Sequence, residues 1–262
     1  MKVTYMNGAG NDFMVVDARG QSWDFPRMAR ELCALTGADG FMAVDYAEDG
    51  AAADFRLHFY NSDGSRGEMC GNGARCICRY AYELGIAGEQ MRVQTDAGLV
   101  LGWRLSEERY RIRLNTPSVV DFSRKPGCCY VELGNPGIPH AVVEIPGLDW
   151  AKKEEYRAFA RALRFDPAFP KGANANLFCR VGGEAVRILT FERGVEDFTL
   201  ACGTGSGSVA TALWCAGQAP GGRLTLQNPG GELEVEIRGE GGIVRELYLI
   251  GPTEIGKVLE LP

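Results

Sequence analysis

The chain has 262 residues, of which 45% are hydrophobic, 24% charged and 10% aromatic, so it is neither disordered nor a collagen or coiled coil. Its net charge of −6 comes without any basic run long enough to follow a phosphate backbone, so we expect no nucleic-acid partner. No stretch approaches the roughly 18 apolar residues of a membrane span, and residues 1–7 alternate polar and apolar side chains, unlike a signal peptide. We therefore expect a cytoplasmic protein with no membrane partner.

The spacing of apolar residues, together with glycine and proline, predicts a mixture of strands and helices. In chain order, we expect a helix over 26–35, a strand over 55–60, a helix over 74–84, strands over 91–95, 99–105, 110–114, 129–133 and 141–144, a helix over 152–163, a strand over 186–191, a helix over 206–216, and strands over 223–227, 232–237 and 244–250. This order predicts an α+β fold.

The sequence contains an internal repeat with an offset of about half the chain. The matched pairs, each 132 residues apart, are Leu57 and Leu189, Phe59 and Phe191, Cys70 and Cys202, Gly71 and Gly203, and Gly73 and Gly205. In each copy a strand leads through a polar loop to Cys-Gly-x-Gly and then to a helix. We therefore expect two pseudo-symmetric domains, 1–115 carrying Cys70 and 116–250 carrying Cys202, with a strand at about 251–262 that could return to the first.

The repeat places each cysteine at the N-terminus of a helix. The unpaired N–H groups and the positive helix end lower a thiol's pKa from its usual value of about 8.5, and they also bind carboxylates. Two such thiols in a cleft between the domains could act on opposite faces of one carbon. A thiolate would remove a proton while a thiol supplies one, which inverts the centre without a metal or cofactor. Metal binding is not expected, because the sequence has no Cys-x-x-Cys and only two histidines.

The residues that precede the glycine motifs differ between the copies. Asn61 is neutral, whereas the matching positions of the second copy are Glu192, which can pair with an ammonium, and Arg193, which can bind a carboxylate. This asymmetry suits a substrate with two different ends. The alternative is a surface ion pair between the adjacent Glu192 and Arg193.

Four stretches of the sequence resemble signatures of the diaminopimelate epimerase family. They are Asn-Gly-Ala-Gly-Asn-Asp-Phe from Asn7, Met-Cys-Gly-Asn-Gly-Ala-Arg-Cys from Met69, Glu-Arg-Gly from Glu192, and Ala-Cys-Gly-Thr-Gly from Ala201. The resemblance implies a cofactor-independent isomerase that interconverts LL- and meso-2,6-diaminopimelate for lysine and peptidoglycan synthesis. It also implies a homodimer in which each domain is a β-barrel-like sheet around a central helix.

The resemblance also assigns roles to residues. It implies that Cys70 and Cys202 are the two catalytic bases, and that Glu192 and His140 tune the thiols. The residues that it places on the substrate are Asn11, Asn61, Gly71, Asn72, Asn174, Arg193, Gly203 and Thr204. For His140 a purely structural role is the alternative.

Two positions depart from the pattern of the family. Three extra residues separate Asn135 from His140, where the family commonly has Gly-Asn-Pro-His, so Asn135 is displaced or Ile138 takes its place. Asp39 stands where some members carry a glutamine that binds substrate. The alternatives for function are therefore a racemase of another amino acid, of the histidine, glutamate or hydroxyproline type, and a non-catalytic binding protein on the same fold.

Overall fold

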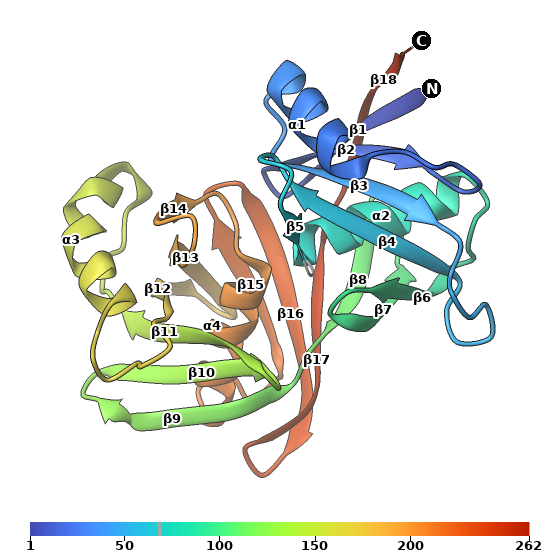
Figure 1. Ribbon diagram of the computed structural model, residues 1–262. Helices are drawn as coiled ribbons and strands as arrows, with labels where there is room; N and C mark the ends of the chain where they lie inside the picture. The colour runs from blue at the N-terminus through green and yellow to red at the C-terminus, as the bar shows by residue number, and fades with distance from the viewer. Residues whose placement is uncertain (68–69, 262) are drawn as a thin grey trace. The chain divides into compact units, whose positions relative to one another are not determined.

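The computed structural model describes residues 1–67 and 70–261, so Met69 of the cysteine motif lies outside the described residues. The chain forms two compact units, which Figure 1 shows in the colours of the sequence. Unit 1 comprises Met1–Arg113 and Gly251–Pro262, and unit 2 comprises Leu114–Ile250. Unit 1 is thus built from two separate segments of the sequence, and unit 2 is continuous.

Unit 1 is a curved sheet with two helices. Its elements are β1 (Lys2–Gly8), β2 (Asn11–Asp17), α1 (Phe25–Thr36), β3 (Gly40–Asp45), β4 (Phe55–Asn61), β5 (Arg66–Gly67), α2 (Gly71–Glu83), β6 (Gln90–Thr95), β7 (Gly98–Arg104), β8 (Arg109–Leu114) and β18 (Glu254–Glu260). The strands pair in the order β18–β1–β2–β3–β4–β6–β7–β8. Only β2–β3 and β4–β6 are parallel.

Unit 2 repeats this architecture. Its elements are β9 (Pro117–Lys125), β10 (Cys128–Gly134), β11 (Gly137–Glu144), a 3-10 turn (Trp150–Lys152), α3 (Lys153–Arg164), β12 (Asn174–Gly182), β13 (Ala185–Glu192), β14 (Asp197–Thr199), α4 (Gly203–Cys215), β15 (Arg223–Asn228), β16 (Gly231–Glu240) and β17 (Ile243–Pro252). The order is β9–β10–β11–β12–β13–β15–β16–β17, and only β11–β12 and β13–β15 are parallel. The pairing order and strand directions match those of unit 1, which confirms the internal repeat.

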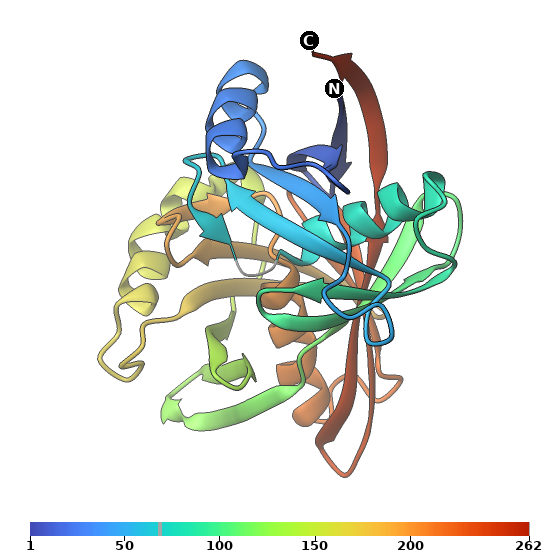
Figure 2. The same cartoon turned by 45° about the vertical axis from the view of Figure 1, so that its right-hand side comes forward.

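Helices α2 and α4 are the central helices of their units. Every residue of α2 from Gly71 to Ala81 is buried, and in α4 every residue from Gly205 to Leu213 is buried. Strands β1, β2, β3 and β7 contact α2, and strands β9–β12, β15 and β16 contact α4. Figures 1 and 2 show the strands of unit 1 curving around α2. The expected α+β fold, with a barrel-like sheet around a helix in each domain, is confirmed.

The other two long helices cover the outer faces of the sheets. Helix α1 begins at the N-cap Asp24, whose carboxylate accepts a bond from the Arg27 N–H, and ends at Gly37 in the left-handed region with φ of 76°. Its apolar stripe packs on β2 and β3 and buries Ala29, Leu32 and Cys33. Helix α3 packs in the same way on β12 and β13 of unit 2. Each sheet therefore has a helix on both faces, which buries most of β3 in unit 1 and the first six residues of β12 in unit 2.

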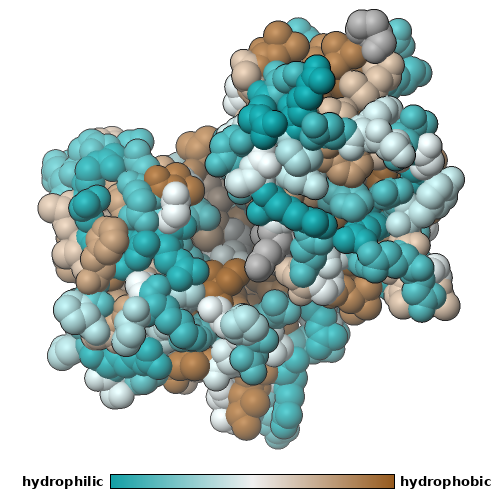
Figure 3. Space-filling model, viewed as in Figure 1, coloured by the Kyte–Doolittle hydropathy of each residue, from teal (hydrophilic) through white to brown (hydrophobic). Residues whose placement is uncertain are grey.

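The face of the molecule drawn in Figure 3 is mostly hydrophilic. Teal side chains cover most of the face that Figure 3 shows, with smaller brown patches among them. Across the described part of the chain, no helix is both long enough and apolar enough to span a lipid bilayer.

Candidate active site

Cys70 and Cys202 occupy equivalent places, as the repeat predicts. Each is the N-cap of the central helix of its unit, with extended backbone angles of −123° and 123° for Cys70 and −118° and 112° for Cys202. Cys70 is half-buried, and Cys202 is buried with 6% of its surface exposed. The helices begin three residues earlier than the apolar spacing indicates, because Gly-x-Gly already forms the first helical turn.

Backbone and side-chain groups surround the Cys202 sulfur. The N–H of Gly205 points at Sγ with a distance of 3.3 Å, and the Thr204 hydroxyl lies 3.5 Å from it. The first intrahelical bond runs from the Ser206 N–H to the Cys202 carbonyl. The N–H groups of Gly203 and Thr204, which come before Ser206, therefore have no acceptor within the helix. This helix end can stabilise a thiolate or a bound carboxylate.

Gly205 is required where the helix passes over the sheet. A Cβ at this position would lie 2.4 Å from Oδ1 of Asn176, 3.0 Å from Oγ1 of Thr190 and 3.2 Å from Cβ of Cys202. At the equivalent Gly73 the nearest atom is a methionine sulfur at 3.1 Å. The glycine of unit 2 therefore lets the Cys202 end of α4 approach the strands more closely than any other residue could.

Strands β11, β12 and β13 bring three predicted residues to one face of the sheet of unit 2. His140 pairs with Asn174 in the parallel β11–β12 ladder, and Glu192 follows two residues after Thr190, which pairs with Asn176. Because side chains alternate along a strand, all five point to the same side. Unit 2 therefore gathers His140, Asn174 and Glu192 on one face of its sheet, and Glu192 hydrogen-bonds with the Cys202 side chain.

His140 is fully buried and neutral. Burial lowers its pKa to about 3. Its Nδ1 lies 3.1 Å from Nδ2 of Asn176, and this amide nitrogen also donates to the carbonyls of Ala141 and Asn174. Nδ1 is therefore the acceptor and Nε2 carries the proton. Nε2 is buried and has no hydrogen-bond partner among the described residues, so a purely structural role leaves one polar atom of the ring unexplained.

Glu192 and Arg193 have separate environments. Burial raises the pKa of Glu192, and a hydrogen bond with the Cys202 side chain offsets part of this effect. Arg193 is exposed; its backbone N–H donates to Oδ1 of Asn174 with a distance of 2.7 Å, and its Nη1 donates to the carbonyl of Lys171. Within residues 1–67 and 70–261, no ion pair joins Glu192 to Arg193, and no carboxylate pairs with Arg193, so the surface ion pair is not formed. The Arg193 guanidinium can accept an anionic ligand.

The unit 1 residues of the predicted site form a polar chain beside Cys70. Asn72 is 2% exposed, and its Nδ2 donates to Oδ1 of Asn11 with a distance of 2.5 Å. Nδ2 of Asn11 in turn donates to Asp39, which also accepts the N–H of Asp12. Asp39, which replaces the family's glutamine, thus orients Asn11. Asn61 lies apart from this chain at the end of β4, where it is exposed and donates to the Ser65 hydroxyl.

The altered segment before His140 forms a hairpin. Asn135 and Pro136 are the turn between β10 and β11, and Asn135 is exposed. Ile138, on β11, is 37% exposed, and His140 is buried two residues further on. The extra residues therefore place Asn135 at the hairpin tip, five positions from the buried histidine.

Two residues that the sequence analysis did not select are central to the geometry. Asn176 is fully buried and links His140, Thr190 and the strand carbonyls. Arg75 is also fully buried, and its guanidinium donates to Oδ1 of Asn72 and to the carbonyl of Gly71. The alternation Asn174-Ala-Asn176 could have indicated the first, since it puts both amides on one face of a strand. Nothing in the sequence reveals that Arg75 is buried.

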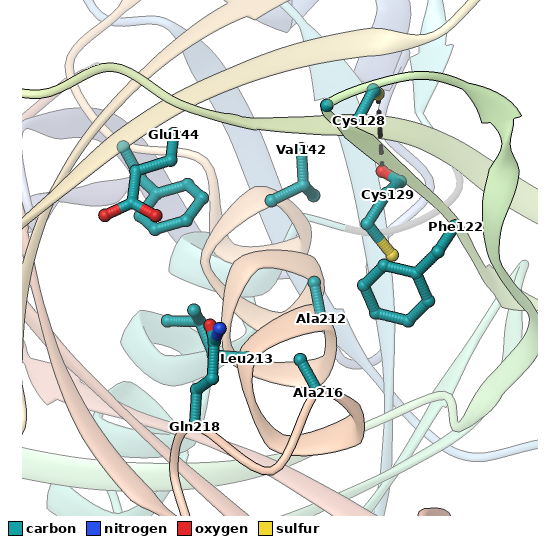
Figure 4. A pocket seen from close by; sticks show the side chains of 11 residues that line it. Phe122, Cys128, Cys129, Val142, Glu144, Ala212, Leu213, Ala216 and Gln218 are labelled. Carbon is teal, nitrogen blue, oxygen red and sulfur yellow. Dashed lines mark hydrogen bonds between the residues drawn. The ribbon is translucent and has the colours of Figure 1, made fainter.

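A separate cavity of about 290 Å³ lies in unit 2 and contains none of the predicted site residues. Figure 4 shows Val142, Leu213 and Phe122 around it, with Cys128 and Cys129 on one side. Burial raises the pKa of Cys128 to about 11 and that of Cys129 to about 12, so both stay protonated at neutral pH. Among the described side chains, no group of three or more His, Cys, Asp or Glu could hold a metal ion.

Comparisons with known proteins point to one family. The model of the family "Diaminopimelate epimerase" matches residues 3–119 and 133–255. A diaminopimelate epimerase of Archaeoglobus fulgidus is 34% identical, with 89% of this chain and 88% of the relative covered. One from Aquifex aeolicus is 33% identical, with 99% and 96% covered.

Solved structures with low sequence identity share the fold. A PhzF-family phenazine biosynthesis protein from Bacillus anthracis has a TM-score of 0.76 at 16% identity, with 100% of this chain and 99% of that chain covered. A hydroxyproline epimerase from Agrobacterium vitis, solved with trans-4-hydroxy-L-proline, has a TM-score of 0.68 at 16% identity, with 100% and 90% covered. These likenesses concern the fold alone.

Proposed function

The chain belongs to the diaminopimelate epimerase family, and we propose that it interconverts LL- and meso-2,6-diaminopimelate with Cys70 and Cys202 as its two bases. The observation that carries the proposal is the pair of cysteines that cap equivalent central helices. This reaction supplies precursors of lysine and peptidoglycan.

The mechanism needs the two sulfurs on opposite faces of the substrate's α-carbon. A thiolate removes the α-proton, and the opposing thiol donates a proton to the other face, which inverts the centre. The developing charge falls on the α-carboxylate, where N–H groups of both helix ends, at Gly71 with Asn72 and at Gly203 with Thr204, can stabilise it.

Glu192 and His140 would tune the thiol of unit 2. A carboxyl group with a raised pKa beside Cys202 limits the negative charge next to a Cys202 thiolate. His140 is neutral at pH 7, so it adds no charge to the site. Both residues thereby keep Cys202 able to alternate between thiol and thiolate.

Arg193, Asn174, Asn61 and Asn11 would recognise the distal end of the substrate. The Arg193 guanidinium has no carboxylate partner among the described residues, and this favours a substrate with a second carboxylate. A substrate without one would leave Arg193 with no anionic partner in the complex. This argument favours diaminopimelate over histidine or hydroxyproline.

The test is epimerisation in deuterium oxide. The purified chain should convert LL-diaminopimelate and introduce deuterium at the α-carbon of recovered substrate and product, with no loss after dialysis against EDTA. Cys70→Ala and Cys202→Ala should each abolish inversion. Turnover of L-histidine, L-glutamate or trans-4-hydroxy-L-proline, with none of LL-diaminopimelate, would overturn the substrate assignment. Two single variants as active as the wild type would overturn the two-base mechanism.

We also propose, from the family resemblance, that the chain works in the cytoplasm as a homodimer. Sedimentation equilibrium of the purified protein would give about twice the 28.5 kDa of the chain if this is right, and the monomer mass if it is wrong.

A further inference from the structure

The first turns of α2 contain a buried cation that the mechanism above does not use. Arg75 is 0% exposed and lies five residues after Cys70. Its Nη2 donates to Oδ1 of Asn72 with a distance of 3.0 Å, and its Nη1 donates to the carbonyl of Gly71 with a distance of 3.3 Å. Nε is buried without an acceptor among the described residues. All of the bonds that hold this guanidinium therefore go to neutral oxygens.

This location is unfavourable for a cation. In the described part of the chain no carboxylate forms an ion pair with Arg75, whereas Arg79, one turn later, lies 4.0 Å from Glu83. The positive end of the helix dipole adds to the cost of a buried charge near the N-terminus. Burial lowers the pKa of Arg75 to about 10, so it still carries its proton at pH 7. A buried positive charge at such a position is strongly destabilising unless an anion lies close to it.

The thiols around Arg75 narrow the choice of anion. Cys76, Cys70 and Cys78 are the groups whose charge raises the pKa of Arg75. Cys76 and Cys78 are fully buried, and burial raises the pKa of each to about 12, so both stay neutral thiols at pH 7. Cys70 is half-buried at the cap of the helix, where a thiolate is favoured. Among these three thiols of the described chain, Cys70 is therefore the one that can be an anion at pH 7.

Arg75 also fixes the amides beside Cys70. An arginine side chain only donates, so the oxygen of Asn72 must face Arg75 and its nitrogen must face Asn11. The oxygen of Asn11 is then occupied, and its nitrogen faces Asp39. Arg75 at one end of this chain and Asp39 at the other therefore fix the orientation of both side-chain amides.

The repeat shows that this arrangement belongs to one copy. The position equivalent to Arg75, 132 residues later, is Gly207, where a Cβ would meet Leu114, Leu133 and Leu247 at 2.9–3.4 Å. Unit 2 has instead a carboxyl group, Glu192, beside its cysteine. A cation bonded to the two residues after Cys70 and an acid bonded to Cys202 give the two thiols different surroundings.

We propose that Arg75 is a positioning residue that holds Cys70 as the resting thiolate and locks Asn72 and Asn11 toward the substrate. The proposal rests on the proposed function in that it treats Cys70 as a catalytic base. It names no new substrate contact for Arg75, which acts through its neighbours.

The test measures the Cys70 thiol without using the substrate. Full-length chain carrying Cys202→Ser is alkylated with iodoacetamide from pH 5 to pH 10, and modification of Cys70 is localised by tandem mass spectrometry. The variants are Arg75→Met, Arg75→Lys and the matched control Arg79→Met, which removes a second buried arginine of α2, bonded to the Thr253 carbonyl. Circular dichroism checks that each variant is folded.

The midpoint of alkylation at Cys70 should lie below the ordinary thiol value of about 8.5 when Arg75 is present. Arg75→Met should raise this midpoint by at least about 1 pH unit, which is a tenfold loss of thiolate at pH values below the midpoint. In Arg75→Lys the midpoint should stay close to that of the chain with Arg75, because the positive charge is kept. Arg79→Met should leave the midpoint unchanged. With Cys202 intact, the acidic limb of kcat against pH should move upward in Arg75→Met by a similar amount. KM for LL-diaminopimelate should also rise in Arg75→Lys, because the forked donor to Asn72 is lost.

Three results would overturn the proposal: a midpoint for Cys70 at or above 8.5 with Arg75 present, an unchanged midpoint in folded Arg75→Met, or equal shifts in Arg75→Met and Arg79→Met. If Arg75→Met does not fold, the proposal is still tested by the midpoint of Cys70 with Arg75 present and by the comparison of that midpoint with the one in Arg75→Lys. A chain that fails to turn over LL-diaminopimelate but shows the alkylation shift would refute the proposed function and leave the role of Arg75 intact.

Discussion

Replacing His140 by glutamine should make unit 2 less sensitive to acid. The folded histidine has a pKa lowered to about 3 by burial, whereas an unfolded histidine has a pKa of about 6.5. Between these values the unfolded chain binds a proton that the folded chain does not. The stability that neutral His140 provides is therefore fully present above about pH 6.5, and it is lost as the pH falls toward 3.

The size of the effect follows from the two pKa values. From pH 6 to pH 4 the unfolded histidine becomes almost fully protonated, which lowers the free energy of unfolding by about 2–3 kcal/mol. Because His140 is 0% exposed, solvent screening does not reduce this figure. His140→Gln removes the titrating group, so it should lose that much less stability than the wild type over the same interval.

The assay is urea denaturation at pH 6 and pH 4, followed by pulsed hydrogen exchange and mass spectrometry of peptides from β11–β13, which report on unit 2. His58→Gln is the matched control, since His58 is the other histidine of the chain and lies in unit 1. Burial lowers the pKa of His58 too, but Asp45, 3.3 Å from Nε2, offsets part of that effect. An equal pH-dependent loss in wild type and His140→Gln would refute the reasoning.

Three further predictions concern the N-terminal ends of the central helices and the core of unit 2. Gly205→Ala should destabilise unit 2 by about 1–3 kcal/mol, because the new methyl group would overlap Asn176, whereas Gly73→Ala should cost less; equal urea midpoints for both would contradict the argument. Cys202→Ser should abolish epimerisation and leave the melting temperature unchanged or higher, because serine is a good N-cap. A large fall in melting temperature would contradict this and show that the sulfur has a packing role. Phe191→Ala, at a position 1% exposed, should lower the free energy of unfolding by about 3–5 kcal/mol in urea titrations, and a loss below 1 kcal/mol would contradict its place in the core.

The helices and the places of the two cysteines at helix N-termini could be predicted from the sequence because their signals are local. The periodicity of α2 and α4, the glycines after each cysteine and the fixed offset between the copies need no knowledge of tertiary structure. The sequence analysis did not predict β2, β3, β9 and β12 as strands. In β3, Gly-Phe-Met-Ala-Val is buried throughout, because α1 covers one face of the sheet and α2 the other. A strand buried on both faces loses the alternation by which strands are recognised.

The neighbours of the site residues could not be predicted, because they depend on pairing between strands. Asn174 and Asn176 are two residues apart in the sequence, yet only the register of β12 with β11 places them beside His140. Burial of Arg75 depends on the strands that surround α2. The sequence analysis selected Asn174, and the structure shows that Asn174 accepts a bond from the Arg193 backbone while Asn176 contacts His140.

The pairing of β18 with β1 has a consequence for the order in which the chain can fold. Lys2 pairs with Glu260 and Val3 with Leu259, so one edge of unit 1 is supplied by residues translated after all of unit 2. On the ribosome, the continuous segment 114–250 can complete its barrel first. Unit 1 is synthesised first, but the outer edge of β1 stays unpaired until β18 has been made. An exposed strand edge can pair with other chains. Nascent chains of this protein therefore carry their greatest aggregation risk in the half that emerges first.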